Sequence, residues 1–497
     1  MDWMDPFSVL FLLALTLAFL WKMSRSWNGS SHRLPPGPKA LPLIGNLHQM
    51  DLKRPYRTML QFSKQYGPVY RIQLGWQKMV VLAGYEAVKE ALVNQGDAFA
   101  DRPHVPIFDD QRGGHGILFS NGEVWKVMRR FTISTLRDYG MGKKPIEDRI
   151  IEECSFLLQK FESFNGKPFE TTTVVNGAAS NIIVSILLGK RLEYEDPTFK
   201  RLLHMLREDV KLLGSRSVLL YNTFPALGFL FGARKTIIDN LKEMRDFIQA
   251  AFIERLNVLD ENDQRSFIDA FLIRQKEEKN KNQSNGFFHS ENLKAVVNDL
   301  FAAGTESATT TLRWGLLLMM KYPEIQRKVQ EEMTKVIGSA QPRIEHRAKL
   351  PYTDAVVHEI QRFGNISPTA APHVTNADVT LGGYFIPKGT HIVPLLYSVL
   401  YDESQWEKPF KFYPEHFLDS DGKFIKRDAF LPFSAGRRVC AGETLAKMEL
   451  FLFFTSLLQR FTFQPAPGTS KEDLDLTPVS GITLYPMPYR ICAVSRF

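Results

Sequence analysis

One cysteine of the chain lies in a loop that is suited to hold a metal. The loop reads Phe433-Ser434-Ala435-Gly436-Arg437-Arg438-Val439-Cys440-Ala441-Gly442. From Glu443 to Arg460 the sequence has no Gly or Pro and is rich in Leu, Phe, Ala and Met, which predicts a helix. Cys440 would then lie at a helix N-terminus, where free N–H groups and the helix dipole favour a thiolate. A thiolate is a strong axial ligand for haem iron.

Three neighbours of Cys440 fit such a site. Gly436 removes a side chain where the backbone must approach a flat macrocycle, and Arg438 can bind a carboxylate such as a haem propionate. Phe433 can keep water from the sulfur. Two other interpretations stay open, namely a buried structural cysteine beside an ordinary loop arginine and a zinc ligand. Zinc is disfavoured because the other two cysteines are remote in sequence and no Cys/His pair shows ligand spacing.

The pattern Phe-x-x-Gly-x-Arg-x-Cys-x-Gly resembles the signature of the haem-thiolate monooxygenases, the cytochrome P-450 superfamily, at all five fixed positions. The resemblance covers nearly the whole chain. Within the superfamily, the chain is similar to vertebrate microsomal family 2, and most similar to its fish-type subfamilies. It implies a mainly α fold with a small β-rich region and one haem b. It also implies hydroxylation or epoxidation of lipophilic molecules with O2 and two electrons from NADPH.

A long helix is predicted upstream of the cysteine loop. Ser290-Glu291 can cap it and Pro323 would end it after Tyr322, which gives over thirty residues. In its middle, Gly304 and a cluster of hydroxyl side chains can divert backbone hydrogen bonds. We therefore expect a local opening there, with room for a small molecule and water.

This middle segment resembles the oxygen-activating turn of the superfamily. Ala303, Gly304 and Glu306 match, whereas Ser307 stands where threonine is usual. Serine keeps the hydroxyl that holds a water and passes protons, but it lacks the methyl that restricts the rotamer. The resemblance implies that Glu306 and Ser307 are catalytic. With serine in place of threonine, we expect more oxygen to be reduced without product formation. From the segment alone, an acidic residue on a solvated face stays an alternative for Glu306.

A Glu-x-x-Arg motif, which places opposite charges on one helical face, occurs twice. Glu324 and Arg327 follow directly after Pro323, and we assign this copy no function. Glu359 and Arg362 lie in a more apolar predicted helix, over residues 355–363.

By resemblance, the later copy is a structural, buried ion pair that locks the segment before the haem loop. The third member of this group is usually an arginine. Here the turn Pro414-Glu415-His416-Phe417 offers a histidine, which can still donate to a carboxylate.

Further haem and substrate contacts follow from the same resemblance. The expected propionate contacts are Arg102, Trp125, Arg129, His373 and Arg438. For Trp125 and Arg129, an ordinary amphipathic basic helix is the alternative. By position, the substrate pocket is expected to be lined by Phe108, His115, Phe301, Ala303, Ala371 and Ile482. These residues are mostly apolar and offer no fixed charge, so a fatty acid, a steroid or a xenobiotic would fit.

Electrons must come from a partner, because the sequence has no Gly-x-Gly-x-x-Gly motif. Gly114-x-Gly116, for example, is followed by Phe119 where the third glycine belongs. The resemblance implies NADPH–cytochrome P-450 reductase, with cytochrome b5 as a second donor. A basic face near the cysteine would suit an acidic reductase. Its predicted members are Lys126, Arg130, Arg137, Lys143, Lys144, Arg437 and Lys447.

Composition and charge limit the other classes. The chain has 497 residues, of which 44% are hydrophobic and 37 are Phe, so we expect a large apolar interior. The chain has only three cysteines, which argues against a disulfide framework and favours a reducing compartment. The net charge of +8 permits a membrane surface or an acidic partner but is too modest to imply nucleic acid.

The N-terminus predicts a membrane anchor. Residues 7–21 form an apolar run with Asp5 before it and Lys22 and Arg25 after it, which favours an uncleaved signal anchor over a cleaved peptide. The positive-inside rule puts the remaining chain in the cytosol, on the endoplasmic reticulum membrane. We predict an anchor over 1–23, a basic and proline-rich hinge over 24–46 and a haem-thiolate catalytic domain over 47–497.

Within the catalytic domain we predict a strand pair, Val69 to Leu74 and Lys78 to Ala83, and mostly helices from Tyr85 to about residue 365. The apolar segment 218–232, interrupted by Pro and Gly, either dips into the bilayer or belongs to the core.

Two other classes of function stay open. A haem-thiolate isomerase or dehydratase would turn over hydroperoxides without a reductase or the pair of Glu306 and Ser307. A non-catalytic haem or lipid carrier would lack the reduced-CO absorbance band of the superfamily.

Overall fold

The computed structural model describes Ala14 and residues 33–260, 263–280 and 286–496. The predicted anchor over 1–23 lies outside these residues apart from Ala14. Among the residues described, no helix is long and apolar enough to cross a bilayer. The described part of the predicted hinge lies along the first strand, where Arg71 N donates to Pro36 O at 2.7 Å and Asn46 N donates to Gln73 O at 2.6 Å.

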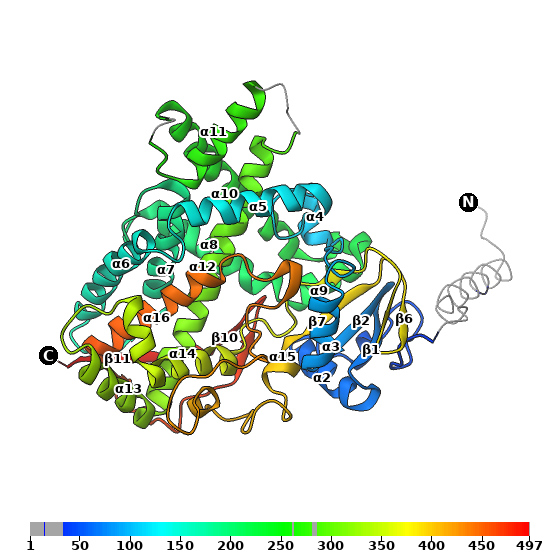
Figure 1. Cartoon of the computed structure of the whole chain (residues 1–497). Helices are drawn as coiled ribbons and strands as arrows, with labels where there is room; N and C mark the ends of the chain where they lie inside the picture. The colour runs from blue at the N-terminus through cyan, green and yellow to red at the C-terminus, as the bar shows by residue number, and fades with distance from the viewer. Residues whose placement is uncertain (1–13, 15–32, 261–262, 281–285, 497) are drawn as a thin grey trace, which may run out of the picture.

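The chain is mainly helical, as predicted (Figure 1). The α-helices are α2 (Pro55–Tyr66), α3 (Tyr85–Lys89), α4 (Pro106–Arg112), α5 (Gly122–Asp138), α6 (Lys144–Glu162), α7 (Thr172–Leu188), α8 (Pro197–Leu213), α9 (Arg216–Thr223), α10 (Gly232–Asn257), α11 (Phe267–Asn280), α12 (Ser290–Lys321), α13 (Pro323–Val336), α14 (Pro351–Gly364), α15 (Leu396–Leu400) and α16 (Glu443–Arg460). A π-helical turn, η2 (Glu90–Asn94), continues α3, and short 3₁₀ turns are η1 (Leu47–Gln49), η3 (Pro225–Leu230), η4 (Ile344–Lys349), η5 (Pro414–Phe417) and η6 (Gly436–Arg438).

The strands form small sheets, and β1, β2 and β7 lie together at one side of the molecule (Figure 1). They are β1 (Val69–Leu74), β2 (Gln77–Ala83), β3 (Phe169–Glu170), β4 (His373–Val374), β5 (Val379–Leu381), β6 (Tyr384–Ile386), β7 (His391–Leu395), β8 (Phe461–Pro465), β9 (Pro478–Ser480), β10 (Leu484–Pro486) and β11 (Arg490–Ser495). One sheet has the order β1-β2-β7-β4, a second β3-β11-β8, and β9-β10 and β5-β6 are hairpins. The predicted strand pair is confirmed, with its second strand beginning at Gln77.

Helix α12 runs through the middle of the helical part (Figure 1), in contact with α7, α10, α14 and α16. Its apolar residues belong to the largest hydrophobic cluster, which it shares with α6, α7 and α16. The predicted helix is confirmed to within one residue at its end. Ser290 is the first helical residue and not the cap, because the ring of His289 accepts the hydrogen bond from Asn292 N at 3.4 Å.

The predicted local opening in α12 is wrong, since the helix stays α-helical through this segment. A Cβ at Gly304 would lie 2.4 Å from Cδ1 of Ile183, so the glycine lets α7 approach closely. The hydroxyls bond back along the helix without breaking it. Ser307 Oγ donates to Ala303 O at 2.7 Å, and Thr311 Oγ1 donates to Ser307 O at 2.9 Å.

Candidate functional site

Cys440 lies between η6 and α16, so its predicted place near a helix N-terminus is confirmed. Its own N–H donates to Phe433 O at 3.1 Å. Burial raises the pKa of the thiol, although the N–H of Gly442 and Arg129 act in the opposite direction. The N–H groups of Gly442 and Glu443 at the helix terminus favour the thiolate, as expected, but desolvation outweighs them. A bound metal cation would hold the sulfur ionised.

The structure explains the glycine at position 436 differently from the predicted close approach of a macrocycle. Its φ is +75°, and a Cβ would lie 1.7 Å from the carbonyl oxygen of Leu92 in η2. A residue with a side chain is therefore strained in its backbone and collides with a neighbouring segment.

Three arginines lie close together beside the cysteine loop. They come from the segment before α4, from α5 and from η6, and each donates to backbone carbonyls. Arg102 donates to Ala371 O at 2.8 Å and Pro372 O at 2.7 Å, Arg438 donates to Ala100 O and Ser120 O at 2.7 Å each, and Arg129 donates to Val439 O. These bonds fix the cluster to the cysteine loop and to the segments before α4, α5 and β4.

The cluster is electrostatically unbalanced. Burial, and then the charge of Arg129, lower the pKa of Arg102 to about 9. Burial, and then the charge of Arg102, lower the pKa of Arg438 to about 8. In the described part of the chain, none of the three makes a salt bridge with a carboxylate. Buried cations that repel one another in this way call for an anionic ligand.

Trp125 and His373 border the same cluster. The guanidinium carbon of Arg438 lies 3.8 Å from the centroid of the Trp125 ring, and the buried indole N–H has no partner among the described residues. His373 is buried, and its Nδ1 lies 2.7 Å from Phe99 O, so Nδ1 carries the proton. Burial, and then Arg102, lower the pKa of His373 to about 3. The ring is therefore neutral and would donate from Nε2 only after protonation.

These residues fit a haem. Cys440 is exposed even though surrounding protein desolvates its thiol, and Ala303 is exposed at the centre of the buried helix α12. A thiol, together with an indole N–H and three arginines that find no acceptor and no salt-bridge partner, respectively, among the residues the structure describes, matches an iron ligand and two propionates.

Glu306 is held by two threonines. Thr310 Oγ1 from the same helix and Thr483 Oγ1 from the β9–β10 turn both donate to its Oε1, at 2.9 and 3.0 Å. Burial raises the pKa of Glu306, which these two bonds oppose. The alternative of an acidic residue on a solvated face is wrong for that reason. The hydroxyl of Ser307 donates to Ala303 O along the helix and not to the carboxylate of Glu306.

Comparison with known proteins decides the family. Residues 35–493 match the family model described as Cytochrome P450. The chain belongs to the cytochrome P450 family. It is 54% identical over 456 residues to "Cytochrome P450 2K6" of Danio rerio, covering 92% of this chain and 90% of the relative. It is 51% identical to "Cytochrome P450 2K1" of Oncorhynchus mykiss (98% and 96%), and 46% identical to "Cytochrome P450 2C5" of Oryctolagus cuniculus (99% and 100%).

These matches confirm the predicted family 2 and its fish-type subfamily. The P450 family uses haem b with O2 and electrons from NADPH through a reductase, and its members are haem-thiolate monooxygenases. The predicted cofactors are therefore confirmed for the family.

Five of the six predicted substrate-pocket residues of this P450 lie in two groups beside α12. Buried Phe301, exposed Ala303 and the β9–β10 turn with Ile482 lie at its middle, where Ile482 N donates to Val210 O at 3.1 Å. The second group lies near its start. There the ring of His115 lies 4.8 Å from that of His289, and Phe108 in α4 stacks on Phe119 at 4.4 Å. Ala371 instead lies at the arginine cluster, through its bond with Arg102.

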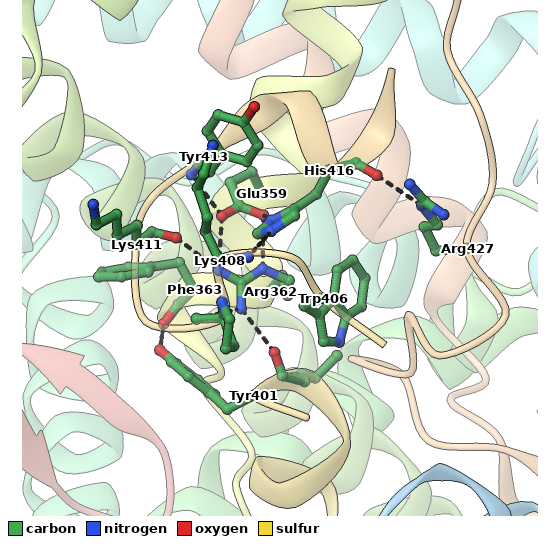
Figure 2. A network of polar contacts seen from close by, with 12 residues as sticks. Glu359, Arg362, Phe363, Tyr401, Trp406, Lys408, Lys411, Tyr413, His416 and Arg427 are labelled. Atoms are coloured by element: carbon green, nitrogen blue, oxygen red, sulfur yellow. Dashed lines mark hydrogen bonds and ion pairs between the residues drawn. The ribbon is translucent and has the colours of Figure 1, made fainter. Parts of the chain in front are cut away.

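Glu359 and Arg362 form a fully buried ion pair (Figure 2). The contact is bidentate, with Arg362 Nε and Nη2 each 2.7 Å from a different carboxylate oxygen. The guanidinium also donates to Leu400 O, Pro409 O and Lys411 O at 2.7 to 3.0 Å. One ion pair thereby fixes the long segment between α15 and η5 to α14.

His416 completes this group as a neutral ring. Its Nδ1 lies 3.2 Å from Glu359 Oε2, and its Nε2 accepts from Lys408 N at 3.1 Å. Because Nε2 accepts, the proton is on Nδ1, and the histidine donates to Glu359 without carrying charge. The earlier copy of the motif differs, since Glu324 and Arg327 are exposed in α13.

Sequence reasoning missed several members of these groups. Thr483, which binds Glu306, lies 177 positions away in sequence. The N–H of Tyr413, which donates to Glu359 Oε1 at 2.8 Å, is a backbone group that no residue type reveals. Thr310 could have been found from the sequence, because it belongs to the hydroxyl cluster and lies four residues after Glu306, on the same face of the helix.

We predict that Glu359→Ala prevents haem incorporation. Removing one partner of such a buried pair costs about 3–5 kcal/mol, because Arg362 is left as a buried, unpaired charge. The matched control is Glu324→Ala, which removes the glutamate of the exposed copy of the motif. Its free energy of unfolding should stay within about 0.5 kcal/mol of the wild-type value. Haem content and the thermal midpoint of both variants are the measurements. Normal haem uptake by Glu359→Ala would refute the assigned role.

Proposed function

We propose that this chain is an NADPH- and reductase-dependent monooxygenase that inserts one oxygen atom from O2 into lipophilic substrates by hydroxylation or epoxidation. The observation that carries the proposal is the cluster of Arg102, Arg129 and Arg438 beside Cys440, in which, among the described residues, no arginine forms a salt bridge with a carboxylate. Bound haem supplies an iron that activates O2, and a cysteine thiolate on that iron favours cleavage of the O–O bond.

In this proposal the residues of the chain have separate tasks. Cys440 would bind the haem iron through its sulfur, and Phe433, whose carbonyl accepts from the N–H of Cys440, would shield the sulfur. The three arginines and the Trp125 N–H would hold the propionates, with His373 at their edge.

Glu306 and Ser307 are proposed to hold and move protons. Both threonine hydroxyls bind Oε1 of Glu306, so Oε2 is left to carry a proton that burial helps to retain. The hydroxyl of Ser307 donates its hydrogen bond to Ala303 O, and its lone pairs can accept a hydrogen bond from a water. Without the methyl of threonine, the hydroxyl is free to rotate and lose that water.

The substrates are proposed to be lipophilic molecules, such as fatty acids, steroids or xenobiotics. Phe108, Phe301, Ala303, Ala371 and Ile482 are apolar, and burial lowers the pKa of His115, which favours its neutral form. A pocket with no fixed charge selects by shape and apolar area, which suits an unspecific monooxygenase.

An acidic reductase is proposed to dock on the basic face, with cytochrome b5 as an alternative donor. Arg129 ties α5 to the cysteine loop, and a Cβ at Gly142 would lie 3.2 Å from Thr444, so the start of α6 lies beside α16. Lys126, Arg437 and Lys447 of this face form salt bridges with Glu123, Asp97 and Glu443, whereas Arg130, Arg137, Lys143 and Lys144 are exposed. Exposed charges steer association more than they add affinity.

The proposed location is the cytosolic face of the endoplasmic reticulum membrane, with a single N-terminal anchor. Besides the sequence of the first 23 residues, exposed apolar side chains support a membrane contact. Phe229 and Leu230 in η3 are 82% and 63% exposed, and Leu43 and Trp76 are exposed near β1. The end of α9, which directly precedes η3, lies beside β2, since Gln77 Nε2 donates to Asn222 O at 3.3 Å. Such a patch on one side favours contact with lipid.

Product analysis tests the proposal. Purified protein with reductase and NADPH should convert members of a panel of lipids and drug-like molecules to products that carry one oxygen atom from ¹⁸O2. Omission of NADPH or of the reductase should abolish product. Conversion of hydroperoxides without either would instead establish the isomerase or dehydratase alternative.

The serine at position 307 generates a separate prediction. We expect Ser307→Ala to lower the ratio of product formed to NADPH consumed at least about threefold, because no hydroxyl is left to hold a water. Ser307→Thr should raise the ratio above that of the wild type. The control is Ser155→Ala, whose exposed hydroxyl makes the same kind of bond, to Ile151 O. If both Ser307 variants keep the wild-type ratio, Ser307 has no part in proton delivery.

A further inference from the structure

Charged and polar side chains from three elements act on the carboxyl of Glu306. They are Thr310 and Arg313 in α12, Thr483 and Tyr485 in the β9–β10 turn and β10, and Arg207 in α8. Helix α7 packs against this part of α12, since Ser180 Oγ donates to Thr305 Oγ1 at 3.1 Å, but α7 contains no charged residue. Two of the groups that act on Glu306, Arg313 and Arg207, are cations.

Burial and the two cations act on Glu306 in opposite directions. Burial raises the pKa of Glu306, and the bonds from Thr310 and Thr483 oppose this rise. The charge of Arg313, and then that of Arg207, also lower the pKa. Tyr485 adds no charge, because burial, and then the charge of Glu306, raise the pKa of its phenol. The arginines are therefore the charges that favour the ionised form of the acid.

The register of α12 places Arg313. It follows Glu306 by seven residues, or two turns, so it lies on the same helical face about 10 Å further along the axis. Long side chains in a helix lean towards its N-terminus, which brings the guanidinium closer to Glu306. Thr310 lies between the two on this face, where its hydroxyl donates to Glu306 at 2.9 Å.

Arg313 is a buried cation without a carboxylate in contact. It is 7% exposed, and in the described part of the chain it forms no salt bridge and its Nε has no hydrogen-bond partner. The hydroxyl of Tyr489 donates to the backbone carbonyl of Arg313 at 2.7 Å, a bond that leaves the guanidinium uncompensated. A charge inside a protein is costly without an opposite charge. Ionised Glu306 supplies that opposite charge at longer range.

Arg207 acts on Glu306 from the surface. Its Nη2 lies 3.5 Å from Glu170 Oε1, and the two side chains are 39% and 44% exposed. Thr172 Oγ1 donates to the same oxygen of Glu170 at 2.7 Å. Because solvent screens exposed charges, we expect Arg207 to act on Glu306 more weakly than buried Arg313 does.

The separation of these charges matters for the chemistry. In the contact ion pair of Glu359 and Arg362, two short bonds hold the carboxylate to the guanidinium (Figure 2). Charges at longer range favour the anion less strongly. An acid in such a field can keep a proton and also release it, which proton transfer requires.

We propose that Arg313 and Arg207 are positioning residues for proton delivery, because charges held at a distance keep Glu306 able both to carry a proton and to release it. The proton leaves Oε2 for the oxygen of a water, and a proton from solvent replaces it, so the step needs no oxidant or reductant. The role in delivery rests on the function proposed above for Glu306. The electrostatic effect does not, so the two are tested separately.

An infrared titration of the haem-loaded protein measures the protonation of Glu306. Subtracting the spectrum of Glu306→Gln isolates the band of the protonated carboxyl, because other buried acids such as Glu449 are present in both proteins. Arg313→Met removes the charge and keeps the length of the side chain. It should raise the pH at the midpoint by at least about one unit. Arg313→Lys keeps the charge and should keep the wild-type midpoint.

Arg207→Met is the second variant, should Arg313→Met disturb the fold. Its midpoint should rise by a smaller amount, because solvent screens this charge. The matched control is Arg201→Met in the same helix, which also removes an exposed salt bridge, with Glu243 at 2.7 Å, and should leave the midpoint unchanged. An unchanged midpoint in Arg313→Met and Arg207→Met would overturn the inference. An equal rise in Arg313→Met and Arg313→Lys would do the same, since the effect would then not depend on charge.

The pH profile of the enzyme with reductase and NADPH tests the role in proton delivery. The ratio of product formed to NADPH consumed should fall towards high pH, where Glu306 loses its proton. Arg313→Met should move this fall to higher pH by the same shift as the infrared midpoint, and Arg201→Met should keep the wild-type profile. A shifted midpoint with an unmoved profile would overturn the proposed role of Glu306 in proton delivery, and with it that of the arginines, but not the electrostatic effect.

Discussion

Positive charge that the protein itself does not neutralise is the constraint on which the proposed site depends. Arg102, Arg129 and Arg438 come from separate segments, and each is fixed by backbone carbonyls, so the protein cannot relieve their repulsion by moving one side chain. Burial and this repulsion lower the pKa values of Arg102 and Arg438. The charge of an anionic ligand would raise both pKa values again, which is how a fold can hold a dicarboxylate such as haem firmly.

The same fold shows what a balanced buried cation looks like. Arg362 has its carboxylate, its carbonyls and a neutral histidine next to that carboxylate, so no donor of the group is left for a ligand. This closed network holds the chain that leads to the cysteine loop, whereas we propose that the arginine cluster receives the cofactor. The two groups differ because Arg362 has a carboxylate partner, whereas the three arginines form no salt bridge among the described residues.

Local patterns made much of this predictable. The boundaries of α12 and α16 and the β1–β2 pair follow from periodicity and from Gly and Pro, and the cysteine motif fixes the loop. Contacts between distant segments were not predictable. Gly436 is required by Leu92 and Gly304 by Ile183, and Thr483 reaches Glu306 from another element. The raised pKa of the Cys440 thiol also depends on burial, which no local pattern reports.

The reduced-CO spectrum of cysteine variants tests the central claim most directly, namely that Cys440 is the thiolate ligand of a haem held by the arginine cluster. Cys440→Ser should lose the absorbance band that gives the family its name. Cys154→Ser and Cys492→Ser should keep it, because those cysteines are buried elsewhere in the core. A Cys440→Ser protein that binds haem and still shows the band would contradict the account.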